Sequence, residues 1–362
     1  MSLKSVGISI LTTIVFALVV VRASDTQQAA DKPVEQTRKN IQVLKGLPES
    51  QLFLAMNFVG DSLGVHCDYC HVKDGDKWLW EKDDKKPKLV GREMMRMVLE
   101  LNRTKFNGEP VVTCYSCHRG SLRVERMAPL PPRDFAKEAR QSESKVLPSA
   151  KEVVDRYLTA VGAKADSLSK TIVMRGTAER STGSGPFEIV FKQPNKLLAK
   201  QTTSQGMITQ ATNGTTGWIQ TTKGTTPMTE ENLRQVNTLL SLYNPIKIPE
   251  SATRAEVTAI AKVDDREAYA LTIADNATQS TQLFFDVETG LLLRMVTVTN
   301  TMLGPLSVQR DFSDYKDVAG LKLPFIIRTS DVAAFDIAIR RFSEIKIDST
   351  VDDKIFDTPT TP

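Results

Sequence analysis

The chain has 362 residues, which is enough for about two domains with hydrophobic cores of their own. Hydrophobic residues make up 41% of it and charged residues 25%, a globular composition that excludes the disordered and fibrous classes. The net charge of +4 gives no reason to expect a nucleic-acid partner, since such partners normally require a clustered basic face.

The first residues hold one lysine and then a predominantly apolar run over residues 6–21. This pattern is typical of a secretory signal peptide or a signal anchor. The run has about 16 residues, whereas a membrane-spanning helix needs roughly 20, which favours cleavage after Ala23 or Ser24. We therefore predict a signal peptide or anchor over residues 1–24 and a periplasmic location, with residues 6–21 as the anchor if the segment is retained.

Two copies of the pattern C-x-x-C-H contain all four cysteines of the chain, in "CDYCH" and "CYSCH". The first copy holds Cys67, Cys70 and His71, and the second holds Cys114, Cys117 and His118. Because the two thiols lie about one helical turn apart, each can form a thioether with a haem vinyl group while the following imidazole reaches the iron. The motifs therefore predict two covalently attached haem c groups, with His71 and His118 as iron ligands.

Two other interpretations of the cysteines are open at this point. A disulfide within one C-x-x-C closes a very small loop, and a thioredoxin-like redox site needs a βαβ context that is absent here. A zinc site of four cysteines has acceptable spacing, but it leaves both following histidines without a role. We favour haem because it uses all of these residues.

The sixth ligand of each iron decides the chemistry, and methionine is the candidate because only one further histidine, His66, is present. His66 directly precedes the first motif, so it is badly placed to reach the opposite face of the haem that this motif attaches. Met56 lies on a predicted helix upstream of the first motif. A second predicted helix carries Met94 and Met97 on one face, whereas Met95 points elsewhere. We predict His/Met ligation through Met56 and either Met94 or Met97; the alternative is that these side chains only fill the core.

The stretch "VGREMMRMVLELN", followed by "VTCYSCHRG", resembles the repeat of the cytochrome c subunit of photosynthetic reaction centres, in which a methionine-bearing helix precedes C-x-x-C-H. The similarity covers roughly residues 45–122 and extends to Arg92, Asn102 and Gly120. The resemblance implies a haem-binding unit and favours Met94 over Met97 as the axial ligand. That family carries four haem motifs and this chain carries two, so it resembles a dihaem variant.

Two segments next to the motifs differ from them in character. The segment "GDKWLWEKDDKKPK" is charged and contains Trp78 and Trp80; we interpret it as a solvated loop, with partner docking as the alternative. Residues 125–149 concentrate prolines and charges with little periodicity, which predicts an interdomain linker. A dihaem cytochrome c domain is therefore predicted over residues 33–124.

From Ala150 onward, a short helix leads into runs rich in Val, Ile, Thr and Phe that are separated by turn signals. They predict a strongly curved antiparallel sheet of about eight or more strands with one helix inside or against it. The landmarks "NGTTGW", "FFDVETGLLLR" and "FSDYKDVAGLKLPF" resemble periplasmic lipoprotein-carrier half-barrels, the LolA-like superfamily. Residues 150–358 are predicted as this domain. The predicted fold class is α+β multidomain, a mainly helical dihaem c-type cytochrome domain followed by a curved antiparallel β half-barrel with a helix.

The second domain has no histidine and no cysteine, and carboxylates such as Asp286 and Asp311 are interpreted as solvated turn residues. A curved sheet can instead offer an apolar concavity for a lipid or quinone-like ligand, or a docking surface. We expect an electron-transfer protein, not an enzyme, with two His/Met-ligated haems and redox proteins as partners. The alternatives are a peroxidase-like haem enzyme with one open iron position, and a lipid-binding envelope protein with a redox module.

Overall fold

The structure is a computed structural model that describes residues 31–75, 77–127, 146–163, 171–181, 183–204, 206–228, 233, 236, 255–274, 279–330 and 337–359. The predicted signal peptide or anchor over residues 1–24 lies outside these residues, as do residues 128–145 of the predicted linker. Within the described ranges, no helix combines the length and the hydropathy needed to cross a membrane.

The N-terminal segment is built from short helices and one hairpin. These elements are α1 (Val34–Thr37), α2 (Glu49–Leu63), α3 (Cys67–Cys70), β1 (Val72–Asp74), β2 (Lys77–Leu79), α4 (Lys86–Lys105) and α5 (Cys114–His118). Helix α2 ends at Gly64, whose φ of 66° is left-handed and suits a residue without Cβ. Helix α4 has Pro87 in its first turn, where a missing N–H costs nothing, and Arg103 and Lys105 in its last turn, where they complement the helix dipole.

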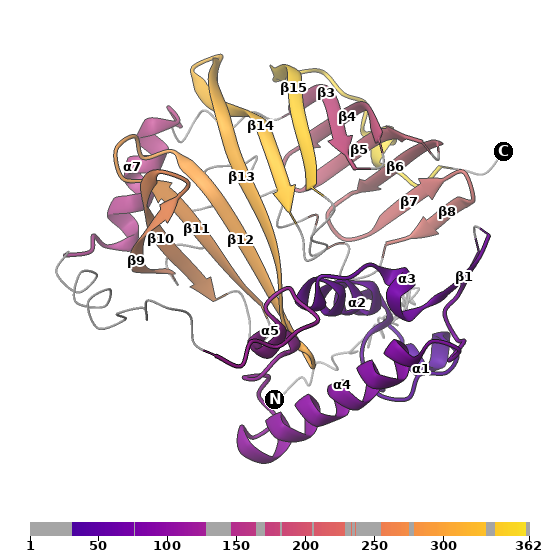
Figure 1. Ribbon diagram of the computed structural model, residues 1–362. Coiled ribbons are helices and arrows are strands. Elements are labelled where there is room, and N and C mark those ends of the chain that lie inside the picture. Colours follow the sequence, from indigo (N-terminus) through magenta and orange to yellow (C-terminus); the bar gives the residue numbers. More distant parts are fainter. Residues whose placement is uncertain are drawn as a thin grey trace, which may run out of the picture.

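One open antiparallel sheet of 13 strands forms most of the remaining described chain (Figure 1). Its strands are β3 (Thr171–Arg180), β4 (Gly183–Lys192), β5 (Lys196–Thr203), β6 (Gly206–Thr212), β7 (Gly217–Thr221), β8 (Gly224–Pro227), β9 (Ala255–Val263), β10 (Arg266–Ala274), β11 (Gln279–Asp286), β12 (Leu292–Thr301), β13 (Gly304–Val318), β14 (Leu321–Ser330) and β15 (Ile337–Ile347). The order is β8-β7-β6-β5-β4-β3-β15-β14-β13-β12-β11-β10-β9. Two meanders, β3 to β8 and β9 to β14, are thus joined by the final strand β15.

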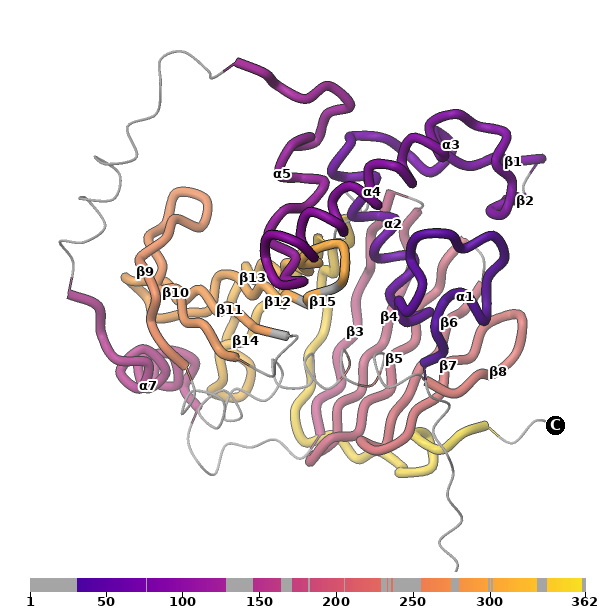
Figure 2. The backbone as a smooth tube through the Cα atoms, turned by 90° about the horizontal axis from the view of Figure 1, so that it is seen from below, coloured from indigo at the N-terminus to yellow at the C-terminus, as the bar shows by residue number. Residues whose placement is uncertain are grey.

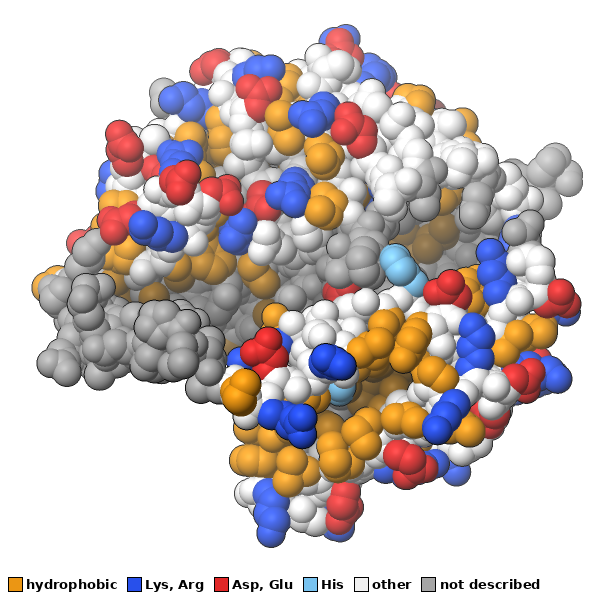
Figure 3. All heavy atoms as spheres, viewed as in Figure 1, with side chains coloured by type: hydrophobic (Ala, Val, Ile, Leu, Met, Phe, Trp, Pro, Cys, Tyr) orange, Lys and Arg blue, Asp and Glu red, His pale blue; other side chains and the backbone are white. Residues whose placement is uncertain are grey.

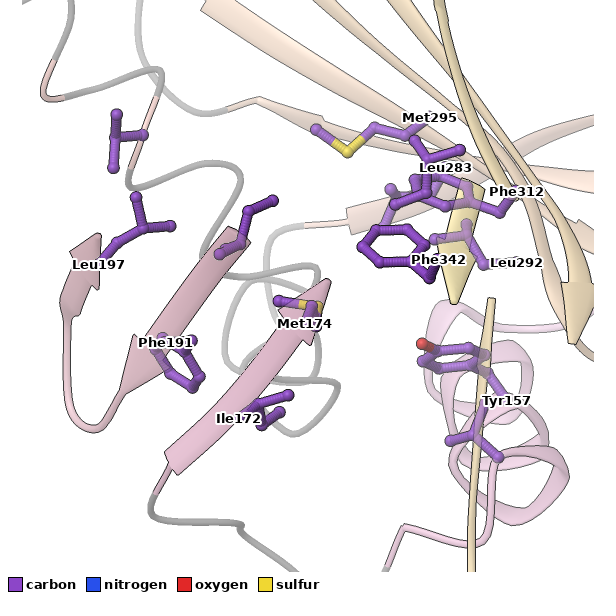
Figure 4. Packing of buried hydrophobic residues seen from close by; sticks show 14 of the residues in the cluster. Tyr157, Ile172, Met174, Phe191, Leu197, Leu283, Leu292, Met295, Phe312 and Phe342 are labelled. Carbon is purple, nitrogen blue, oxygen red and sulfur yellow. The ribbon is translucent and has the colours of Figure 1, made fainter. Parts of the chain in front are cut away.

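The main hydrophobic core lies on one face of this sheet and extends across both meanders. Helix α7 (Ala150–Ala160) begins with a capping box in which Ser149 accepts a hydrogen bond from the N–H of Glu152. It buries Tyr157, whose ring centroid lies 5.2 Å from that of Phe285. Figure 4 shows Tyr157 together with side chains of strands from both meanders, among them Met174 and Phe312. In Figure 2, α7 lies beside β9 and β10, apart from the N-terminal segment.

The opposite face of the first meander is covered near the C-terminus by a 3-10 helix, η1 (Asp353–Phe356). Phe356 packs there with Trp218, Val190 and Leu198 in a second cluster. The indole N–H of Trp218 donates a hydrogen bond to the carbonyl oxygen of Phe356 at 3.1 Å. These strands are therefore buried on both faces, which explains their nearly continuous apolar runs.

The predicted fold class is wrong. The described residues are mostly β, dominated by the 13-stranded open sheet, and do not form a mainly helical domain followed by a half-barrel. Three of the N-terminal helices, α1, α3 and α5, are single turns of 4, 4 and 5 residues, so only α2 and α4 are long helices in this segment. The strand number was underestimated because several long runs are hairpins: the run that contains Pro194, for example, forms both β4 and β5.

The turn between β12 and β13 joins the sheet to the N-terminal segment. Leu303 of this turn is fully buried in a cluster with Val34 and Leu47. Beside it, Leu306 of β13 is buried with Phe58 of α2. In Figure 1 the lower ends of β12 and β13 reach α2 and α5, in agreement with these contacts. The boundaries predicted at residues 124 and 150 stay a prediction, but the two parts share hydrophobic clusters.

Asp286, at the end of β11, is a buried structural group and not the solvated turn residue that was expected. Its side chain is 2% exposed and lies 2.6 Å from Nε of Arg266. Its Oδ1 accepts hydrogen bonds from the backbone N–H of Glu288 at 3.0 Å and of Thr289 at 2.6 Å. Burial raises the pKa of this carboxyl, but the hydrogen bonds from Thr289 and the charge of Arg266 outweigh it and hold the pKa below its usual range.

We predict that Asp286→Asn lowers the free energy of unfolding by about 1.5–3 kcal/mol at pH 7, because a charged hydrogen-bond acceptor is lost. Because the pKa of Asp286 is lower in the folded protein than in the unfolded chain, its carboxylate stabilises the folded state at pH values above the unfolded pKa of about 3.9. This stabilisation is lost as the pH falls through the folded-state pKa. The difference in unfolding free energy between Asp286→Asn and the wild type should therefore become smaller at low pH. Urea unfolding at pH 7 and at successively lower pH measures it. Glu288→Gln, which changes an exposed carboxylate of the same turn, is the control, and an equal loss there would contradict the prediction.

Candidate functional site

A single cavity contains both C-x-x-C-H motifs. Its volume is about 1180 Å³, above the range of roughly 300–1,000 Å³ that is usual for a small-molecule pocket. All nine predicted site residues line it: Met56, Cys67, Cys70, His71, Met94, Met97, Cys114, Cys117 and His118. In Figure 3, hydrophobic side chains and a histidine gather around a hollow at the lower right, where Figure 1 places α2 to α4. The structure thus brings together every residue that the motifs singled out.

The first motif forms the single helical turn α3, in which the N–H of His71 donates to the carbonyl oxygen of Cys67 at 2.9 Å. Cys67 and Cys70 stand three residues apart on this turn, so their thiols face the same side. Burial, followed by the charge of Lys88, lowers the pKa of His71. The neutral imidazole that results is the form that binds metals.

The second motif forms α5, which begins with a capping box between Thr113 and Ser116. The backbone N–H of Thr113 donates to Oγ of Ser116 at 3.0 Å. Nδ1 of His118 lies 3.0 Å from the carbonyl oxygen of Ser121. With its proton on Nδ1, His118 donates this hydrogen bond and leaves Nε2 available to an iron ion, the arrangement usual for a ligating histidine.

A buried asparagine attaches the second motif to helix α4. Asn102 is 3% exposed, its Nδ2 donates to the carbonyl oxygen of Val112 at 2.7 Å, and its Oδ1 accepts from the N–H of Val112 at 3.0 Å. Both backbone groups of one residue, two positions before Cys114, are thereby satisfied by one side chain. This pair of hydrogen bonds sets the distance between the methionine-bearing helix and the second pair of thiols.

A close backbone contact holds the two motifs beside each other. The N–H of Gly120, just after the second motif, donates to the carbonyl oxygen of Ser62 at 3.0 Å. Gly64, just before the first motif, approaches so closely that a Cβ on it would lie 2.3 Å from the carbonyl oxygen of Gly120. Both glycines have positive φ, 66° and 82°. Only glycine permits this approach and conformation together, and the contact places both motifs on one cavity.

The methionines fall into two groups. Met56 of α2 and Met95 of α4 pack against the hydrophobic cluster that includes Leu303, although both also line the cavity. Met94 and Met97 are 40% and 54% exposed and line the cavity as well. That Met94 and Met97 share a helix face from which Met95 is excluded stays a prediction. Which sulfur binds iron stays a prediction.

The tryptophan segment between the motifs was interpreted as a solvated loop, but it forms one wall of the cavity. Trp80 lines the cavity with its ring edge-on to His71 at 5.1 Å, and its ring also lies 5.8 Å from that of Phe53 in α2. Trp78 stacks on Trp80 at 4.6 Å. Two tryptophans at i and i+2 point to the same side of an extended segment, and this signal could have indicated a packed wall.

An ion pair attaches the same segment to α4. Asp83 lies 2.9 Å from the guanidinium of Arg92 and 2.9 Å from Nζ of Lys88. The hydrogen bonds of Arg92 and then of Lys88 hold the pKa of Asp83 well below its usual range. Arg92 is itself buried and also donates to the carbonyl oxygen of Asn40 at 3.2 Å. Three separate stretches of chain therefore meet at one guanidinium beside the cavity.

The donor set fits haem c. Each motif offers two free thiols on one side of a helical turn and a histidine after them, and the cavity wall adds thioether sulfur and apolar surface. Across the described ranges, no group of three or more His, Cys, Asp and Glu side chains stands close enough to hold a metal ion by itself. The four cysteines therefore do not form the four-ligand cluster that the zinc interpretation requires.

Comparison with known proteins agrees with this class of site. Residues 8–168 match the family described as the photosynthetic reaction centre cytochrome C subunit. The chain is 36% identical over 89 residues to the photosynthetic reaction center cytochrome c subunit of Thermochromatium tepidum, which is 23% of this chain and 20% of that protein. It is 31% identical over 88 residues to cytochrome c-554 of Chloroflexus aurantiacus, again 23% of this chain and 20% of that protein.

The chain thus spans about a fifth of the length of these curated relatives. The resemblance of the N-terminal part to reaction-centre cytochrome c subunits is confirmed, and it implies covalently bound haem c.

Solved structures resemble the other part of the chain. A LolA superfamily protein from Nitrosomonas europaea covers 59% of this chain and 99% of its own length, with 11% identity and a TM-score of 0.42. A DUF1329 family protein from Desulfovibrio piger covers 58% of this chain and 98% of its own, with 10% identity and a TM-score of 0.41. The LolA-like resemblance expected from the sequence is thus found again, but at this TM-score it carries no argument about ligands.

We predict that Asn102→Ala reduces haem attachment at the second motif more than at the first, because the substitution leaves the backbone N–H and carbonyl of Val112 without partners. The expected cost is about 1–3 kcal/mol in unfolding free energy, with less haem on the peptide that contains Cys114 and Cys117. Mass spectrometry of the digested protein measures haem on each motif peptide. Arg103→Ala, an exposed change on the same helix, should leave both peptides fully loaded. Equal loss from both peptides in Asn102→Ala would show only general destabilisation.

Proposed function

We propose that the chain is an exported, periplasmic dihaem c-type cytochrome that carries electrons through two His/Met-ligated haems. The observation that carries this proposal is the single cavity lined by both C-x-x-C-H motifs and by methionines from two helices. Residues 1–24 would serve as the signal peptide or anchor.

The proposed roles follow from the donor chemistry. Cys67 and Cys70 would hold one haem, and Cys114 and Cys117 the other, through thioether bonds. His71 and His118 would bind the irons on one side, and a methionine sulfur on the other side would raise the potential of each. The bound haem supplies reversible one-electron chemistry. The protein supplies attachment, orientation and an apolar wall that excludes water.

Methionine sulfurs that can fill the sixth position of each iron favour electron transfer over enzymatic chemistry. A peroxidase-like enzyme needs one iron with an open position, whereas Met56 and the pair Met94 and Met97 offer a sulfur from each of the two helices that line the cavity. Two haems in this common cavity would lie next to each other, which suits electron exchange between them. Redox proteins are the proposed partners.

The sheet would serve for docking or for an apolar ligand. A cavity between α7 and the sheet, lined by Tyr157 and Tyr315 among others, has a volume of only about 30 Å³. This volume suits a water molecule or two and not an acyl chain or a quinone-like tail. A lipid or quinone-like ligand at that place would therefore require α7 to move away from the sheet, and we favour the docking role.

Haem content tests the proposal first. The mature protein should carry two covalent haems that resist acid-acetone extraction, since thioether bonds survive this treatment. Cys70→Ala and Cys117→Ala should each reduce attachment at one motif and leave the other loaded. Intact-protein mass spectrometry counts the haems, and a mass shift for one haem or none in the wild type would contradict the proposal.

Measuring the sixth ligand of each iron distinguishes an electron carrier from an enzyme. With sulfur on both irons, the oxidised protein should show the weak sulfur-to-iron absorption near the red edge of the visible spectrum, and Met56→Ala should remove part of it. The reduced wild type should bind carbon monoxide slowly, because a methionine must leave first. Rapid carbon monoxide binding at one haem with peroxide turnover would favour the enzyme. An unchanged spectrum in Met56→Ala would mean that Met56 only fills the core.

A further inference from the structure

The turn between β12 and β13 is a part of the sheet whose hydrophobic contacts lie outside the sheet. Leu303 has no exposed surface, and its buried neighbours Val34, Leu44, Leu47 and Ala55 all belong to the N-terminal segment. The side chain is thus inserted into the hydrophobic cluster at the base of the N-terminal segment, where its burial stabilises the contact.

Gly304, the next residue, touches the second haem motif. A Cβ on Gly304 would lie 2.5 Å from Cγ2 and 3.2 Å from Cβ of Thr113, and 3.7 Å from the ring of Phe58. Thr113 is buried and forms the capping box that starts α5, directly before Cys114. The turn therefore presses against the residue that sets where the motif helix begins.

Leu306 extends the contact to a cysteine of the motif. It is buried with Phe58 of α2, and Cys114 packs against this pair. Helix α2 is also the element whose end holds Gly120, after the second motif. One turn of the sheet therefore supports the second motif directly at Thr113 and Cys114 and indirectly through α2.

We propose that the β12–β13 turn is a positioning element for the second haem motif, with Leu303, Gly304 and Leu306 as the positioning residues. This inference rests on the proposed dihaem function. The sheet would fix the orientation of the α5 turn, and with it the direction in which His118 and the two thiols face the cavity. The sheet would then contact the second motif directly and reach the first site only through α2 and its Met56, so the N-terminal segment alone would not form both sites normally.

The test compares two glycines with nearly the same φ. Gly304 has a φ of 132° and Gly183, at the start of β4, has a φ of 134°, but a Cβ on Gly183 would meet nothing within 4 Å. Alanine imposes similar backbone strain at both positions, and only Gly304→Ala adds a clash with Thr113. In the full-length holoprotein, Gly304→Ala should lower haem loading on the Cys114 and Cys117 peptide or shift one of the two potentials. Gly183→Ala should do neither.

A rescue variant identifies the contact. Thr113→Ser removes the methyl carbon that lies nearest to the added Cβ and keeps the hydroxyl of the capping box. Combined with Gly304→Ala, it should restore part of the loading or of the potential at the second site. Absence of any rescue would mean that Gly304 does not act through Thr113 and would overturn the proposal.

A second pair of variants keeps the proposal testable if Gly304→Ala does not fold. Leu306→Ala should change loading or potential more at the second site, whose Cys114 packs against it, than at the first. Leu293→Ala, an equally buried leucine in a cluster within the sheet, should cost similar stability and leave both haem signals at wild-type values. Equal effects of the two changes would overturn the proposal. Fewer than two haems in the wild type would contradict the proposed function instead, so the two failures can be told apart.

Discussion

The contact between the end of α2 and the residue after the second motif is the constraint on which the site depends. One hydrogen bond, from the N–H of Gly120 to the carbonyl oxygen of Ser62, joins two points of the chain that each border a haem motif. The approach leaves no room for a Cβ on Gly64, so a side chain there would force the two backbones apart. With this contact made, two short turns of chain face one space, and the apolar side chains of α2 and α4 need cover only one cavity.

Buried polar side chains help to hold the helices and loops around the cavity in place. Asn102 binds both backbone groups of Val112, and Arg92 joins Asp83 to the carbonyl of Asn40. Such buried polar contacts are directional, so they fix one arrangement of these chain segments. Hydrophobic packing alone would allow several arrangements. The turn that contains Leu303 is held by two long paired strands, so the sheet offers this segment a rigid surface to pack on.

Candidate site residues could be predicted from the sequence where their chemistry requires a fixed local spacing. Thioether attachment requires two thiols one turn apart, and the helical period placed Met94 and Met97 on one face, so these positions could be found without a structure. Trp80 was missed because its partner His71 is reached only after the chain has turned back in a hairpin. Asp286 was misjudged because an aspartate followed by a turn looks the same whether the carboxylate faces water or a buried arginine. The contact of Leu303 joins segments far apart in the chain, and such contacts leave no periodic signal.

The position of β15 has a consequence for the synthesis of the chain. Strand β15, the most C-terminal strand of the described residues, lies in the middle of the sheet, where it pairs with β3 on one side and with β14 on the other. Until it arrives, the two meanders are separate sheets, and each exposes an edge that will later be interior. Unpaired interior edges are templates for pairing with other chains, so nascent and C-terminally truncated molecules share the same hazard of aggregation. If the chain is exported, as proposed, the two meanders have to be kept unfolded or shielded until β15 has crossed the membrane.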